Sequence, residues 1–85
     1  VLEQIAENNP FALLSRTEMK GVLRDAIESL PEKEALVLSL YYYEELTLKE
    51  IGLVMELSES RISQLHSQAV LRLRSVLKKL RYDAN

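Results

Sequence analysis

The chain has 85 residues, enough for one small domain with a single core, and nearly half of them are hydrophobic. The absence of cysteine excludes disulfide bonds and thiolate metal sites, and no apolar run reaches the roughly 18 residues of a membrane span. The net charge of −2 conceals an asymmetry, because residues 1–57 carry five basic and eleven acidic side chains, whereas residues 58–85 carry six basic and two acidic ones. A basic end hints at nucleic-acid contact, although it equally fits a solvated helix end.

Residues 1–14 are expected to be a linker, because Pro10 and the asparagines before it interrupt any helix there. The chain starts at Val1 rather than Met, so we expect it to be part of a longer protein. Ser15 and Glu18 then form a capping-box signature, which predicts that the first domain helix begins here. Its apolar residues recur at steps of three and four and form one continuous face: Met19, Val22, Leu23, Ala26, Ile27 and Leu30.

Pro31 ends this helix and is expected to be the first residue of a second one, since its fixed φ suits a helix start and its missing N–H is not needed there. Glu32 and Glu34 complement the positive end of the helix dipole. Four residues are expected to face inward: Leu36, Val37, Leu40 and Tyr41. Of the three consecutive tyrosines that follow, one or two should pack and the rest should lie at the rim of the core, rather than form a stacking platform for single strands.

Thr47 and Glu50 repeat the capping box and open a short third helix whose core positions are Leu48, Ile51 and Met55. Ser58 is expected to cap a long fourth helix, in which one apolar stripe continues for about five turns. The stripe consists of Ile62, Leu65, Ala69, Leu73, Val76 and Leu80. The sequence therefore predicts an all-α protein, a small four-helix domain over residues 15–82 with a C-terminal helix-turn-helix.

The segment from Leu48 to Arg72 has the order of a helix-turn-helix, with a short helix, a tight turn and a longer helix. Such a unit needs a small residue where its helices cross, which Gly52 supplies. It also needs an apolar residue in the turn, which Leu57 supplies, followed by an inward residue such as Ile62. A plain helical hairpin has the same pattern, so these residues alone leave both interpretations open.

The outer face of the fourth helix carries short, uncharged polar side chains: Ser60, Ser63, Gln64, Ser67 and Gln68. A recognition helix lies in the major groove with its first turns against base edges, where hydroxyls donate or accept and Gln pairs bidentately with adenine. A merely solvated face is the alternative, but such faces more often use Lys and Glu, which are better helix formers. The composition of this face favours DNA recognition.

At these residues the sequence resembles a known family. The run SLPEKEALVLSLYYYEELTLKEIGLVMELSESRISQLHSQAVLRLRSVL is similar to region four, the C-terminal domain of bacterial RNA polymerase sigma factors. The stretches LSLYYYEELTLKEIG and SESRISQLHSQAV are most similar to the flagellar class. The resemblance implies a domain that recognises the minus-35 element of double-stranded promoter DNA and docks on the β-subunit flap of the RNA polymerase core. It also implies that an anti-sigma factor can mask the domain.

The resemblance assigns roles to individual residues. The base-reading positions fall on Glu59, Ser60, Ser63 and Gln64, with Gln68 further along the groove. Leu48 and Lys49 match positions that meet the phosphate backbone, and Arg61 is the expected positioning cation of the recognition helix.

Two positions depart from the family pattern. Many relatives have glycine where this chain has Glu56, so a left-handed conformation there would cost about 1 kcal/mol, or the turn differs. Primary sigma factors often have a basic residue in place of Glu59, which shifts the weight of base reading to Ser63 and Gln64.

No Gly-rich phosphate loop, metal-ligand spacing or nucleophile constellation occurs, so neither an enzyme nor a cofactor is expected. The single histidine, His66, lacks a catalytic partner at a defined spacing and is expected to be a packing or surface residue. The basic residues of the last helix, Arg72 among them, either contact phosphate or polymerase or simply suit a helix C-terminus.

We expect a cytoplasmic monomer without membrane contact. Because the first half of the chain is acidic, DNA binding by the isolated domain should be weak. Two other functions stay open: the helix-turn-helix effector domain of another transcription regulator, and a protein-interaction module without direct DNA readout.

Overall fold

The computed structural model describes residues 16–83, with side chains up to Lys79. Within this range the chain forms four helices and no strand: α2 (Arg16–Glu28), α3 (Glu32–Tyr42), α4 (Leu48–Met55) and α5 (Glu59–Asp83). The expected all-α, four-helix architecture is confirmed. The predicted linker 1–14 and the predicted cap Ser15 lie outside the described residues, and no described helix is both long and apolar enough to cross a membrane.

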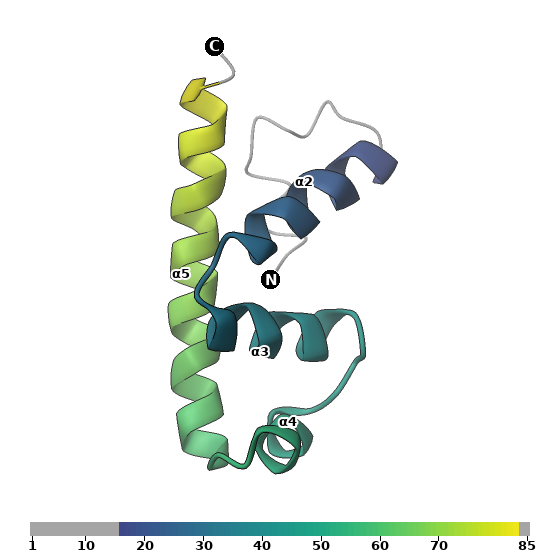
Figure 1. The fold of residues 1–85 in the computed structure, drawn as a ribbon, viewed down its shortest axis with the longest axis vertical. Coiled ribbons are helices and arrows are strands. Elements are labelled where there is room, and N and C mark those ends of the chain that lie inside the picture. The colour runs from purple at the N-terminus through teal and green to yellow at the C-terminus, as the bar shows by residue number, and fades with distance from the viewer. Residues whose placement is uncertain (1–15, 84–85) are drawn as a thin grey trace.

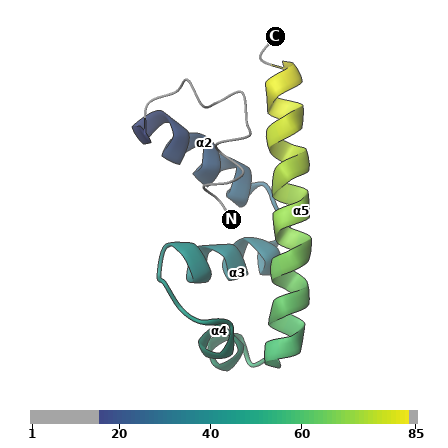
Figure 2. The same cartoon turned by 180° about the vertical axis from the view of Figure 1, so that it is seen from behind.

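Helix α5 runs along the length of the molecule, and the three shorter helices lie on one side of it (Figures 1 and 2). From the C-terminal end of α5 toward its N-terminal end, they follow in the order α2, α3, α4. Each of the three packs against α5. The short helix α4 therefore lies beside the first turns of α5, which is the arrangement that a helix-turn-helix requires.

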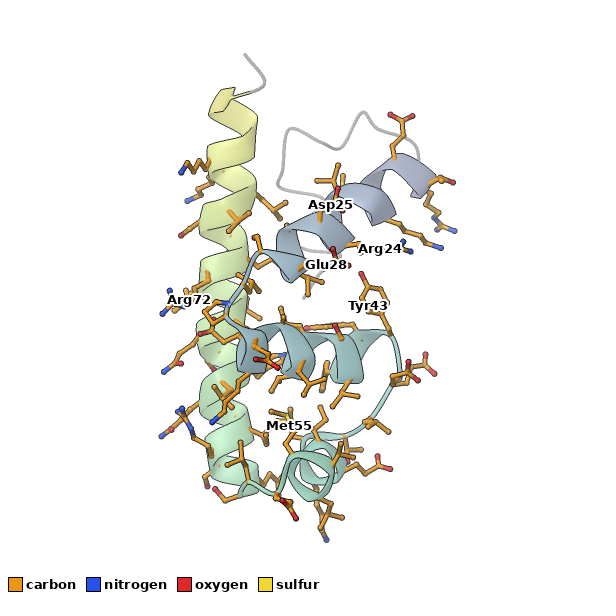
Figure 3. The ribbon with its side chains drawn as sticks, in the orientation of Figure 1. Arg24, Asp25, Glu28, Tyr43, Met55 and Arg72 are labelled. Atoms are coloured by element: carbon orange, nitrogen blue, oxygen red, sulfur yellow. The ribbon has the colours of Figure 1, made fainter. Side chains whose placement is uncertain are left out.

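The core consists of two clusters of buried residues with α3 between them. The α2 cluster contains Ala26, Ile27, Leu30, Leu38, Ala69, Leu73 and Leu77. The α4 cluster contains Val37, Ile51, Ile62 and Leu65, and Met55 packs against it from α4 toward α3 (Figure 3). Helix α3 serves both clusters because its neighbours Val37 and Leu38 point about 100° apart around the helix.

This double contact corrects the predicted inward face of α3. Leu36 was expected to be buried but is 43% exposed, whereas Leu38 is completely buried. The predicted single apolar face of α3 does not include Leu38, because α3 buries two adjacent faces, one in each cluster. Leu40 and Tyr41 are partly buried against the α4 cluster, as expected.

Two smaller expectations were also wrong in detail. Pro31 flanks α3 rather than starting it, because its ψ of 144° is extended and the helix begins at Glu32. In α5, Leu77 is buried although the predicted stripe omitted it, and Val76 is only partly buried. The side chain of Leu80 lies outside the described part of the chain.

Both predicted caps of the helix-turn-helix are confirmed. The Thr47 hydroxyl accepts a hydrogen bond from the Glu50 N–H at 3.1 Å, and the Glu50 carboxylate accepts one from the Thr47 N–H at 2.9 Å. The Ser58 hydroxyl accepts from the Arg61 N–H at 3.1 Å. These bonds satisfy N–H groups that have no partner inside a helix, so both helix starts are well defined.

The turn between α4 and α5 depends on a close approach of the backbone to Gly52. The carbonyl of Gly52 accepts a hydrogen bond from the Leu57 N–H at 2.9 Å. A Cβ added to Gly52 would lie 2.7 Å from the Leu57 carbonyl oxygen, which is backbone and cannot rotate away. Leu57 packs against the α4 cluster, so its predicted place in the turn is confirmed.

Glu56 closes α4 in the left-handed conformation, with φ 58° and ψ 42°. The sequence allowed either a left-handed Glu56 or a turn of different geometry, and the structure has the left-handed Glu56. Residues other than glycine rarely adopt this backbone conformation. A carboxylate is also unfavourable at the negative end of a helix dipole.

The tyrosines pack as expected, two at the edge of the core and one at its rim. Tyr41 and Tyr42 are partly buried, and Tyr43 is 53% exposed. His66 of α5 packs on the first two, with 4.9 Å between the ring centroids of Tyr41 and His66 and 3.4 Å between the Tyr42 hydroxyl and His66 Nε2. His66 is thus a packing residue, and burial lowers its pKa below the ordinary 6.5.

The two glycines offer a matched test of the turn. Gly52→Ala should lower the free energy of unfolding by about 1–3 kcal/mol, because the added methyl group meets the Leu57 carbonyl. Gly21→Ala should raise it by up to about 1 kcal/mol, since a Cβ there meets nothing within 4 Å and alanine favours the helix. Urea unfolding followed by circular dichroism measures the free energy of unfolding of both variants. Equal changes in the two variants would contradict the close approach of the turn to Gly52.

Glu56→Gly should raise the free energy of unfolding by about 1 kcal/mol, because glycine adopts the left-handed conformation without strain. Arg24→Gly is the control, since Arg24 is an exposed residue inside α2 with negative φ, where glycine should be destabilising. The same unfolding experiment applies. A loss of stability in Glu56→Gly would rule out the strain assigned to this turn.

His66 should make the domain less stable in mild acid. Its folded pKa lies below 6.5, so the unfolded chain binds the proton more readily. The contribution of neutral His66 is complete above pH 6.5 and is lost as the pH falls toward the lower folded pKa. The difference in unfolding free energy between the native chain and His66→Gln should therefore shrink over this interval; a difference independent of pH would refute the assignment.

Candidate nucleic-acid interface

The predicted base-reading side chains lie together on the outer face of the first turns of α5. All six predicted residues of this helix are exposed: Glu59, Ser60, Arg61, Ser63, Gln64 and Gln68. The opposite face is anchored in the core, where Ile62 and Ala69 are completely buried and Leu65 is 3% exposed. The core thus fixes the rotation of α5 about its axis and turns the polar face toward solvent.

The start of α4 lies at the same end of the molecule as this face (Figure 1). Lys49 is exposed, whereas the side chain of Leu48 is partly buried against the α4 cluster. Leu48 can therefore meet a phosphate with its backbone N–H rather than with its side chain, because the first N–H groups of a helix point outward at the positive end of its dipole.

Glu50 affects the charge at this helix start. Its hydrogen bonds with the backbone and the side chain of Thr47 hold the pKa of Glu50 below the ordinary 4.5, so the carboxylate stays ionised at neutral pH. The negative charge is tied to the cap and offsets part of the helix dipole. Lys49 is the cation that remains available beside the backbone N–H groups.

Charge is sparse on the α5 face itself. Within its first twelve residues Glu59 and Arg61 are the only Asp, Glu, Lys or Arg side chains. Among the described side chains, the Glu59 carboxylate has no hydrogen-bond or ion-pair partner, and it suits the first turn of α5 because it lies at the positive end of the dipole. Arg61 donates from Nη1 to Oε1 of Gln64 at 3.4 Å.

Further along α5, Arg72 forms an ion pair with a carboxylate of α3. Its Nε lies 3.0 Å from Oε1 and 3.1 Å from Oε2 of Glu34, donating a hydrogen bond to Oε2. Glu34 is almost completely buried at the start of α3, and Figure 3 places Arg72 beside that helix end. A buried carboxylate requires such a partner, so Arg72 holds α3 on α5. No sequence pattern indicated this pair, because its members are 38 residues apart.

Several known proteins are similar to this chain in sequence. Residues 26–75 match the family Sigma-70, region 4. RNA polymerase sigma factor FliA of Salmonella typhimurium is 58% identical over 80 residues, which are 94% of this chain and 34% of the relative. RNA polymerase sigma-D factor of Bacillus subtilis is 49% identical over 71 residues, 84% of this chain and 28% of the relative. The chain thus spans about a third of the length of these curated relatives.

A solved structure has the same fold. It is a cocrystal structure of a flagellar sigma/anti-sigma complex, Sigma-28/FlgM, and it superimposes with a TM-score of 0.71 and 38% sequence identity. The match covers 92% of this chain and 36% of the other. The helix-turn-helix order, its capped helices, the exposed polar face of α5 and the matched residues agree: the chain belongs to the Sigma-70 region 4 family.

Proposed function

We propose that the chain is the C-terminal, promoter-reading domain of a flagellar-type sigma factor. In this proposal residues 15–82 form the domain that recognises the minus-35 element, and residues 1–14 connect it to a preceding sigma domain. The solved relative, which belongs to a flagellar sigma/anti-sigma complex, supports the flagellar class.

One observation carries the DNA-binding part of the proposal. The first turns of α5 expose short polar side chains while the opposite face of the same turns is buried in the core. A helix held in this way can enter the major groove, where hydroxyl and amide groups match the hydrogen-bonding pattern of base edges. A solvated face without such a role would be expected to carry more Lys and Glu.

The proposed roles follow the position of each side chain. Ser60, Ser63 and Gln64 read bases, and Gln68 reaches further along the groove. Glu59 occupies a base-reading position of the family, but its charge is repelled by phosphates, so it contributes mainly to the start of α5. Leu48 and Lys49 contact the phosphate backbone from α4, and Arg61 lies between the two sets of contacts.

The proposed protein partners are the β-subunit flap of the RNA polymerase core and an anti-sigma factor. The solved relative was crystallised with the anti-sigma factor FlgM, which supports the second partner. Large apolar side chains exposed on α3, α4 and α5 support protein contacts in addition to DNA: Leu36, Leu53, Val54 and Leu71. With few cations on its reading face, the domain would draw much of its affinity for a promoter from polymerase.

The domain acts as a binding module rather than as an enzyme in this proposal. Its place of action would be the cytoplasm, where polymerase and the chromosome are. Membership in a family of transcription initiation factors supports both statements.

The experiment joins the chain to the preceding domains of the Salmonella relative and adds core polymerase. Transcription from a motility-type promoter should start, and Ser63→Ala with Gln64→Ala should reduce it strongly, because each lost base contact costs about 1–3 kcal/mol. Initiation is measured on the intact promoter and on one with a scrambled minus-35 element.

Ser75→Ala is the control, since it removes a hydroxyl from an exposed position of α5 away from the proposed groove contacts. It should leave transcription unchanged. An equal effect of the double substitution on intact and scrambled promoters would show that these side chains do not read bases.

A further inference from the structure

We infer that Arg61 is a positioning residue that fixes the orientation of the Gln64 carboxamide, so that the recognition helix distinguishes an A·T base pair from the reversed T·A pair. This inference rests on the proposed function, because it specifies how Gln64 reads its base. It assigns Arg61 a role in specificity in addition to the charge it offers to phosphates.

The two side chains meet on a rigid stretch of α5. Arg61 Nη1 donates to Gln64 Oε1 at 3.4 Å, and the two residues are neighbours on the helix surface because they are three positions apart. The Arg61 backbone N–H donates a hydrogen bond to the Ser58 hydroxyl, and the side chains of Ile62 and Leu65 in the same turns are buried in the core. The cap and the core fix both backbone positions, which leaves only side-chain rotation to be restricted.

The sequence leaves Arg61 without an acidic partner on its own helix. Carboxylates three or four residues away would normally compete for a guanidinium, but Leu57, Ser58 and Leu65 occupy those positions together with Gln64. Glu59 is two residues away and does not face Arg61.

A free carboxamide can rotate by half a turn and exchange its acceptor oxygen with its donor nitrogen. Donation from Arg61 keeps Oε1 on the side of Arg61 and leaves Nε2 on the far side. Oε1 retains a second lone pair, so the carboxamide can still accept from a base while it is held.

The major groove makes this orientation informative. Adenine presents the N7 acceptor beside the N6 donor, and thymine presents the O4 acceptor and its methyl group, so the order of groups reverses between A·T and T·A. A carboxamide held in one orientation fits N7 and N6 in one order only. A carboxamide that can flip also fits the N7–N6 edge of adenine in the reversed pair, which weakens the distinction between the two base pairs.

The experiment measures binding of the 85-residue chain to fluorescent duplexes by anisotropy at low salt, where phosphate contacts keep affinity measurable. The duplex carries a flagellar minus-35 element in which every base pair is replaced in turn by the other three. Gln64→Ala identifies the position that Gln64 reads. There, the native chain should prefer A·T over T·A by about tenfold, and Arg61→Met should reduce this ratio to about twofold or less.

Arg74→Met is the matched control, because it removes the same charge from an exposed position of α5 beyond the proposed reading face. It should lower the affinity for all duplexes by one factor and keep the A·T to T·A ratio. In the DNA-free chain, the side-chain amide signals of Gln64 in ¹⁵N NMR spectra should shift in Arg61→Met and not in Arg74→Met.

The possible failures are distinguishable. If Arg61→Met weakens all duplexes equally and keeps the ratio, Arg61 only binds phosphate and the inference is wrong, although base reading by Gln64 stands. A preference for G·C or C·G at the Gln64 position also overturns it. If Gln64→Ala changes no base preference, the base-reading role in the proposed function fails as well.

Discussion

The backbone contact between Gly52 and the turn that follows α4 is the constraint on which the interface depends. Because Gly52 has no side chain, the Leu57 carbonyl can lie where a Cβ would otherwise be, and Leu57 itself reaches the α4 cluster. This close approach sets the distance between α4 and the first turn of α5. The N-terminus of α4 and the first turns of α5 consequently lie at one end of the molecule, and the proposed function places DNA at this end.

The second constraint is the position of α3 between two clusters. Val37 holds it to α4 and the start of α5, Leu38 holds it to α2 and the later turns of α5, and the Glu34–Arg72 pair adds a polar connection. One continuous helix, α5, and one shared neighbour, α3, therefore join the two clusters.

The few charges on the polar face of α5 bear on DNA affinity and on base specificity in different ways. Non-specific DNA affinity comes mainly from phosphate neutralisation, yet the reading face carries a single arginine and an opposing glutamate. In the proposed function, short polar groups discriminate bases without adding much affinity, and polymerase supplies the remaining affinity. The strained Glu56 turn also shows that the stability of the helix-turn-helix is not maximal.

The sequence by itself determined the four helices, both helix caps, the place of Gly52 and the polar face of α5, because each depends on residues within one or two turns of chain. The proposed base-reading roles of the exposed residues rest on the family resemblance. Only the tertiary structure decided that α3 buries two adjacent strips, so that Leu38 is inside and Leu36 outside, and that Glu34 pairs with Arg72 and Tyr42 with His66. These contacts join residues 24 or 38 positions apart, and no local periodicity specifies how helices so far apart in the chain will meet.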